Sequence, residues 1–236
     1  MSICCWQNNP EFLNMPLFFQ QDIDADTRLA IWKIEEDEPF FLASVPLQRN
    51  ITHPHKRLQH LAGRYLLRLL FPQFPIELIQ VADTRKPYLE DEAFHFSISH
   101  CSDYAAVIVS KTRRVGIDIE LVTDKVARVQ HKFVGDGERE VVNSEWSIVN
   151  NKENEDLFQN TTSHAQLILL WSCKEAVYKW YGRGNMDFKK HMQAVGLITK
   201  GSKSYAVKMV VKKNEDQWLD LHSCFFDDLC MSYVVT

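Results

Sequence analysis

Two acidic side chains stand two positions apart in the otherwise apolar segment VGIDIEL, residues 115–121. The alternation of this segment predicts a β-strand, in which successive side chains point to opposite faces. Asp118 and Glu120 should therefore project side by side, where they repel each other unless a cation lies between them. Two interpretations stay open: acids on an exposed strand, or oxygen ligands for a divalent metal, which would favour Mg²⁺ or Mn²⁺ over zinc. Gly116, just before them, has no Cβ and would let another element approach the backbone.

A second concentration of charge lies in WSCKEAVYK, residues 171–179. The surrounding pattern predicts a helix over residues 165–181 that ends before a glycine. Glu175 and Lys179 are one turn apart on this helix, and Lys174 directly precedes Glu175. The residues alone allow a surface Glu–Lys pair worth about 0.2–0.5 kcal/mol. They equally allow a carboxylate that binds a metal beside an ammonium that binds a phosphate.

A third segment, FSISH at residues 96–100, predicts a strand that ends on Ser99 and His100. A hydroxyl and an imidazole suit contacts with an anion, and Lys86 adds a cation shortly before this strand. Neighbouring strand residues point to opposite faces, so Ser99 and His100 are not expected to form the nucleophile and base of a hydrolase.

The elements that must hold these residues follow an α+β pattern. Residues 56–71 predict the clearest helix of the first half, and Arg64 lies on it, on one stripe with Arg57 and Arg68. That stripe is either a solvated basic face or a row of cations that faces a phosphate. In each half a helix precedes strands, and strand–helix alternation is absent, which favours antiparallel pairing. We therefore expect two similar α+β halves, a pseudo-dimer, each with mostly antiparallel strands and a long helix.

Taken together, these segments resemble the 4′-phosphopantetheinyl transferase superfamily. The strand motif of that family, G-(I/V)-D, is matched by VGIDIE, and its helix motif, (F/W)-(S/C/T)-x-K-E-(A/S)-x-x-K, is matched by WSCKEAVYK. Other segments that resemble family motifs are AGRYLLR at 62–68, KPYL at 86–89 and FSISH at 96–100. The resemblance spans residues 49–181, and the chain length resembles the larger, two-halved, surfactin-synthetase-activating class.

The resemblance implies transfer of 4′-phosphopantetheine from coenzyme A to a serine of an apo acyl carrier protein or peptidyl carrier domain. The products would be the holo carrier and adenosine 3′,5′-bisphosphate. By resemblance, Asp118, Glu120 and Glu175 would hold Mg²⁺, with Mn²⁺ as a substitute. Glu175, or a water on the metal, would take the serine proton, and Lys179 would contact the pyrophosphate. The residues assigned to coenzyme A are Arg64, Lys86, Ser99, His100, Lys174 and Lys179.

Two positions depart from the family pattern. Arg85 precedes Lys86 where the family often has glycine, and arginine lacks the backbone freedom of glycine, so a different loop conformation is expected there. The upstream basic pair that often contacts the 3′-phosphate is not cleanly matched, with Arg49 and Arg57 as candidates.

Two other classes of function compete with this interpretation. A Mg²⁺-dependent nuclease also uses strand acids, but its chemistry requires a lysine two residues after the acid, where Val122 stands. The 27 Lys and Arg against 31 Asp and Glu, a net charge of −4, also disfavour a nucleic-acid partner. A non-catalytic module that binds coenzyme A or the carrier is disfavoured because all three carboxylates and both motif lysines are present.

The expected organisation places coenzyme A nucleotide binding in residues 1–113 and the metal and catalytic residues in 114–236. The active site would lie in the cleft between these halves, and a chain that contains both would act as a monomer.

Six cysteines without a C-x-x-C motif indicate reduced thiols. No apolar run reaches the about 18 residues of a membrane span, and the N-terminus lacks signal-peptide features, so we expect a cytoplasmic protein that binds no membrane. Residues 143–164, rich in Asn, Ser and Glu, predict a surface loop.

Overall fold

The computed structural model describes residues 17–138, 161–213 and 215–236. These residues divide into two compact units. The first contains the described residues up to 80 together with 87–112, and the second contains 81–86 and the described residues from 113 onward. The short segment 81–86 therefore belongs to the second unit by its contacts, although three strands of the first unit follow it in the chain.

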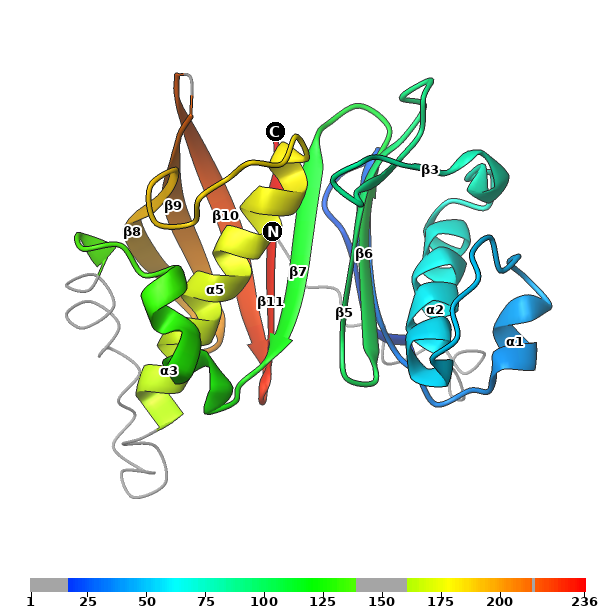
Figure 1. The fold of residues 1–236 in the computed structure, drawn as a ribbon, viewed down its shortest axis with the longest axis horizontal. Coiled ribbons are helices and arrows are strands. Elements are labelled where there is room, and N and C mark those ends of the chain that lie inside the picture. The colour runs from blue at the N-terminus through cyan, green and yellow to red at the C-terminus, as the bar shows by residue number, and fades with distance from the viewer. Residues whose placement is uncertain (1–16, 139–160, 214) are drawn as a thin grey trace. The chain divides into compact units, whose positions relative to one another are not determined.

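The first unit is built on a four-stranded antiparallel sheet in the order β1-β2-β6-β5. Its strands are β1 (Leu17–Asp22), β2 (Thr27–Lys33), β5 (His95–Cys101) and β6 (Tyr104–Ser110). Helix α2 (Pro54–Leu70), cyan in Figure 1, packs against β6, β2 and β5. The short elements are α1 (Glu38–Leu42), η2 (Ile76–Leu78), β3 (Gln80–Val81) and β4 (Pro87–Tyr88).

The core of the first unit lies between α2 and its sheet. Leu61, Ala62 and Leu66 of α2 are fully buried in this core, and they follow the apolar period that predicted the helix. The helix begins at Pro54, two residues earlier than expected, because a proline has no N–H to satisfy in a first turn. It ends at Leu70, before Pro72, which cannot continue a helix.

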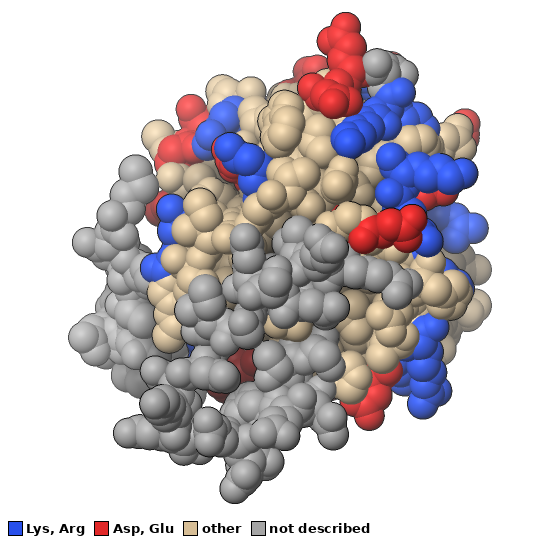
Figure 2. Space-filling view, turned by 90° about the vertical axis from the view of Figure 1, so that its left-hand side faces the viewer, with Lys and Arg blue, Asp and Glu red and all other residues tan. Residues whose placement is uncertain are grey.

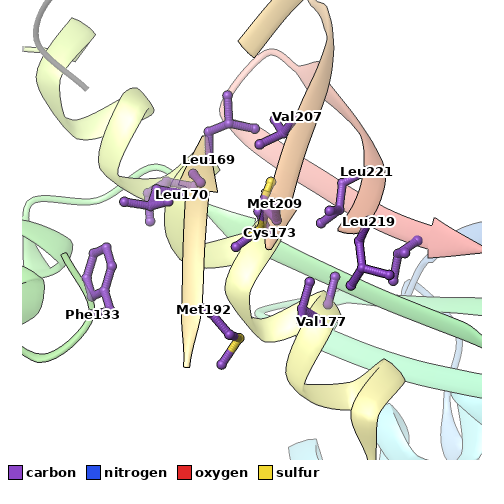
Figure 3. Close-up of a cluster of buried hydrophobic side chains, with 14 of the residues drawn as sticks. Phe133, Leu169, Leu170, Cys173, Val177, Met192, Val207, Met209, Leu219 and Leu221 are labelled. Carbon is purple, nitrogen blue, oxygen red and sulfur yellow. The ribbon is translucent and has the colours of Figure 1, made fainter. Parts of the chain in front are cut away.

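The second unit is built on a five-stranded antiparallel sheet in the order β7-β11-β10-β9-β8. Its strands are β7 (Val115–Leu121), β8 (Met192–Gly201), β9 (Ser204–Lys212), β10 (Asp216–Phe226) and β11 (Leu229–Val235). Helix α5 (Thr161–Tyr181) packs on β7 and β11, while α3 (Lys125–Val129) and η3 (Gln130–Lys132) follow β7 along the chain. Figure 3 shows the core, in which Cys173 and Val177 of α5 lie in one cluster with Met209 and Leu221 of the sheet.

One pairing recurs in both units. Helices follow β2 in the first unit and β7 in the second, and the last strand of each unit, β6 or β11, pairs antiparallel with that strand. Antiparallel sheets, each packed with a long helix, make this an α+β protein, as predicted. None of the described helices combines the length and the apolar character that crossing a membrane requires.

The second long helix begins earlier than its sequence pattern predicts. The prediction placed the start of this helix at residue 165, but α5 begins at Thr161. The prediction was late because the apolar residues of the helix begin only near Leu167, where α5 reaches the core. The surface loop predicted at 143–164 is therefore wrong for its last four residues. The rest of that predicted loop, 143–160, lies outside the described residues.

Candidate functional site

Gly116 allows α5 to lie directly against β7. A Cβ at this position would lie 2.1 Å from the carbonyl oxygen of Ala176 and 2.8 Å from the backbone nitrogen of Trp180. No side chain fits in that space, so the close approach predicted for Gly116 is confirmed, and the approaching element is α5. Asp118 and Glu120 share this face of β7 and therefore project toward the helix.

An ion pair joins the strand to the helix next to this contact. Lys179 Nζ lies 2.6 Å from Oδ1 of Asp118, whose side chain is only 4% exposed. The second acid, Glu120, accepts a hydrogen bond at Oε1 from Nε1 of Trp171, at 3.1 Å. Both strand acids thus meet a polar group of α5, which agrees with the shared face that the alternation predicted.

Glu175 of α5 lies within electrostatic reach of both strand acids. Burial, followed by the negative charge of Asp118 and a smaller contribution from Glu120, raises the pKa of Glu175 to about 7, while the charge of Lys179 opposes this rise. In the described part of the chain, no three His, Cys, Asp or Glu side chains are arranged to hold a metal ion. The structure therefore brings the three predicted carboxylates near one another with an ammonium among them, but not as a preformed metal cluster.

Lys174 lies elsewhere, in the interior of the second unit. Its side chain is 0% exposed, and its ammonium donates to the carbonyl oxygens of Phe133 (2.7 Å) and Phe188 (2.8 Å) and to Oε2 of Glu138 (2.6 Å). These three bonds use the three protons of the ammonium. The assignment of Lys174 to coenzyme A is therefore corrected: this lysine holds loops together and presents no donor to a phosphate.

The last turn of α5 receives donors from other parts of the second unit. The bonds run from Thr84 Oγ1 to the Gly182 carbonyl (3.2 Å), from Lys86 Nζ to the Trp180 carbonyl (3.5 Å) and from Arg114 Nη2 to the Tyr181 carbonyl. Cations suit this position because the carbonyl end of a helix carries partial negative charge. Burial, and then the neighbouring Arg114 cation, lowers the pKa of Lys86 to about 8.

Arg85, which stands where the family often has glycine, has a φ angle of 67°. This angle lies in the left-handed region that glycine adopts without steric cost. The turn is closed by bonds from Arg85 N to Ala82 O (2.8 Å) and from Ala82 N to Lys86 O (3.0 Å). These bonds hold Arg85 in a backbone conformation that glycine adopts more readily, and the difference from the loop of the family stays a prediction.

In the first unit, Arg64 lies on α2 within a group of basic side chains. It is 5% exposed, and its Nη1 donates to the carbonyl oxygen of His60 at 3.4 Å, but its Nε has no hydrogen-bond partner among the described residues. The same holds for His60 Nε2. Burial, followed by the charges of Arg64, Arg49 and His100, lowers the pKa of His60 to about 3. Burial and the charge of Arg49 lower the pKa of Arg64 to about 10, so this basic cluster would be stabilised by an anion.

Two further residues complete the comparison with the sequence predictions. Ser99 is buried and His100 is exposed, as expected for neighbours that point to opposite faces of β5. His60 was not predicted from the sequence. The signal that could have found it is its spacing, because it precedes Arg64 by one turn on the same face of the helix.

Charges of both signs are mixed on the surface of the second unit. Figure 2 shows one face, on which the described Lys and Arg (blue) lie among Asp and Glu (red) and neutral residues (tan) without forming a continuous basic surface. On β9 and β10, for example, Lys208 lies 3.9 Å from Asp220.

Comparison with known proteins identifies the family. The family model ACPS, 4′-phosphopantetheinyl transferase superfamily, matches residues 114–234, which is half of the chain and includes both β7 and α5. A search of curated proteins returned no match. Members of the matched superfamily transfer phosphopantetheine, use coenzyme A and act on carrier proteins. The chain therefore belongs to the 4′-phosphopantetheinyl transferase superfamily.

Proposed function

We propose that this protein transfers 4′-phosphopantetheine from coenzyme A to a serine of an apo acyl or peptidyl carrier protein. The observation that carries the proposal is the contact between β7 and α5, which brings Asp118, Glu120, Glu175 and Lys179 together. In the reaction, the serine oxygen forms a bond to the phosphorus that bears pantetheine. The bond from that phosphorus to the bridging oxygen breaks, and adenosine 3′,5′-bisphosphate leaves with the electron pair.

The three carboxylates fit a divalent cation chemically. Hard oxygen ligands suit Mg²⁺ or Mn²⁺. Burial, and then the negative charge of Asp118 with a smaller contribution from Glu120, raises the pKa of Glu175, and a cation would relieve the repulsive part of this effect. When bound, such an ion would neutralise charge on the pyrophosphate. The ammonium of Lys179 would do the same from the helix, at the oxygens where charge grows in the transition state.

Glu175 is the proposed general base. In the metal-free protein, burial and then the charge of Asp118 raise the pKa of Glu175 to about 7, which makes this carboxylate a stronger base than an ordinary glutamate. In this role Glu175 takes the proton from the carrier serine as its oxygen attacks phosphorus. This assignment leaves the Lys179 ammonium available to the leaving group.

The nucleotide part of coenzyme A is assigned to basic residues. In the first unit, the nitrogens of Arg64 and His60 that have no hydrogen-bond partner among the described residues lie near Arg49 and His100, and a phosphate would accept hydrogen bonds from such a group. The coenzyme A contacts of Ser99 and Lys86 stay predictions of the resemblance. Lys174 leaves the coenzyme A set because all three of its protons are already used.

The test is the intact mass of several apo carrier proteins after incubation with this protein, coenzyme A and Mg²⁺. The proposal predicts a gain of one phosphopantetheine group, which EDTA or the Asp118→Ala variant abolishes while the fold remains intact. Binding of coenzyme A without transfer to any carrier would instead assign the chain to the non-catalytic class. Transfer that persists both in EDTA and in Asp118→Ala would remove the metal from the proposal.

A further inference from the structure

The buried ion pair of Lys174 and Glu138 fixes several loops of the second unit. Glu138 accepts hydrogen bonds from the backbone N–H groups of Gly135 at Oε2 (2.8 Å) and Ala194 at Oε1 (2.7 Å), in addition to its bond with Lys174. The same ammonium holds the carbonyl oxygens of Phe133 and Phe188. The backbone at both phenylalanines is therefore tied to one buried charge.

The rings of these two phenylalanines flank Trp171. The ring of Phe133 meets the indole edge-to-face at a centroid distance of 5.1 Å, and the ring of Phe188 lies at 5.4 Å with a tilt of 37°. Such aromatic contacts stabilise the packing beyond burial alone and restrict the two side-chain torsions of the tryptophan. The indole is thus held in one orientation by residues whose backbone Lys174 fixes.

From that orientation, Nε1 of Trp171 donates to Oε1 of Glu120. We propose that Trp171 is a positioning residue that orients the Glu120 carboxylate for the divalent cation, and that the Lys174–Glu138 pair keeps Trp171 in place. The inference rests on the proposed function, because it takes Glu120 as a metal ligand. Groups that hydrogen-bond a metal-binding carboxylate typically change metal affinity by about 10–100-fold when removed.

The variant Trp171→Phe separates positioning from packing. It keeps an aromatic ring between Phe133 and Phe188 but removes the only hydrogen-bond donor of the side chain. The matched control is Trp180→Phe, on the same helix, which also removes an indole N–H, in this case one that donates to Thr236 Oγ1 at 2.9 Å. Both variants lose a hydrogen bond and indole volume, but only one of them loses a contact with Glu120.

The experiment titrates Mn²⁺ into each protein with coenzyme A present and follows free Mn²⁺ by electron paramagnetic resonance, against the same titration without protein. We expect Trp171→Phe to weaken Mn²⁺ binding by about tenfold or more while Trp180→Phe binds as the parent does. Equal affinity of Trp171→Phe and the parent would overturn this inference and leave the proposed function intact. Equal Mn²⁺ binding by the parent and by Asp118→Asn would overturn the metal site and the inference with it.

A second measurement does not depend on the stability of Trp171→Phe. In ¹⁵N-labelled protein, a single indole N–H resonance should move both in Glu120→Gln and on addition of Mg²⁺ with coenzyme A. The inference expects the same resonance to respond to both changes, and that of Trp180 to respond to neither. If no indole resonance responds to Glu120→Gln, the hydrogen bond on which the inference depends is absent in solution.

Discussion

Lys179 on the helix and Asp118 on the strand are joined by a 2.6 Å ion pair at the point where α5 lies against β7. The side chain of Asp118 is almost fully buried, while a quarter of that of Lys179 stays exposed. The pair therefore has a buried end, which is close to the other carboxylates, and an end that a substrate phosphate can reach. Under the proposed function, Lys179 would have two competing partners, the strand acid and the substrate.

We expect Lys179→Ala to separate metal binding from catalysis. Without the ammonium, Asp118 loses a cation that competes with a divalent ion, so Mn²⁺ should bind at least as tightly as in the parent. Turnover should nevertheless fall by about 10²–10³, the loss typical of one preorganised charge-stabilising group. Steady-state kinetics and Mn²⁺ titration measure the two effects, and a loss confined to KM with unchanged kcat would mean that Lys179 serves ground-state binding only.

The raised pKa of Glu175 predicts a pH dependence of stability in the metal-free protein. The folded protein keeps the Glu175 proton up to about pH 7, whereas the unfolded chain releases it near the ordinary value of 4.5. Between these values the folded state binds more protons, so the free energy of unfolding falls as pH rises through this window and levels off above it.

Urea unfolding of the parent and of Glu175→Gln at several pH values measures this contribution. Glu175→Gln should lack this decline and should be the more stable of the two above pH 7, since it carries no buried charge. The exposed Glu215 provides a control, because Glu215→Gln should follow the parent at every pH. Parallel curves for the parent and Glu175→Gln would show that Glu175 is not buried among like charges in solution.

The buried ion pair of Lys174 and Glu138 predicts that a substitution of Glu138 restores part of the stability that is lost when Lys174 is replaced. Lys174→Met alone leaves Glu138 charged in the interior and should cost about 3–5 kcal/mol of unfolding free energy. Adding Glu138→Gln removes that charge and should recover much of the loss. Urea unfolding measures the stability and calorimetry measures the affinity for coenzyme A. If the double variant regains stability but binds coenzyme A as poorly as a variant of the phosphate site, Lys174 contacts the ligand after all.

Arg85 predicts a gain in stability on substitution by glycine. The left-handed conformation costs an ordinary residue about 1–2 kcal/mol, whereas the extra chain entropy of glycine in the unfolded state costs about 0.5–1 kcal/mol. Arg85→Gly should therefore leave the unfolding free energy unchanged or raise it by up to about 1 kcal/mol. The exposed Arg183, changed to glycine outside this turn, serves as the comparison for loss of a cation. A clear loss of stability in Arg85→Gly alone would show that the arginine side chain has a structural role.

The sequence predicts the positions of Asp118 and Glu120 well because the rule involved is local. A strand alternates its faces, so two acids at alternate positions must share one face, whatever element packs on it. Gly116 could be interpreted for the same reason. The partner of that glycine, α5, is distant in the sequence, and its identity required the structure.

The direction of the Lys174 side chain could not be predicted from local sequence patterns. Lys174 stands beside Glu175 in the motif, but successive residues of a helix point about 100° apart, so the two side chains cannot share a direction. Whether Lys174 faces solvent or the core depends on Glu138, whose carboxylate reaches it from another part of the chain. His60 was missed for a related reason, since its neighbours Arg49 and His100 come close only in the folded first unit.

The borders of the second unit in space differ from its borders along the chain. A fragment that begins at residue 114 contains β7, α5 and all of the sequence that the family model matches, yet it lacks Thr84 and Lys86. Those two side chains donate to the carbonyls of Gly182 and Trp180, and Gly182 has no Cβ, which lets Lys86 approach it closely. Cutting the chain at the apparent midpoint would therefore expose the C-terminal end of α5 to water, one turn beyond Lys179. A recombinant fragment intended to fold as this unit needs residues 81–86 grafted or supplied as a peptide.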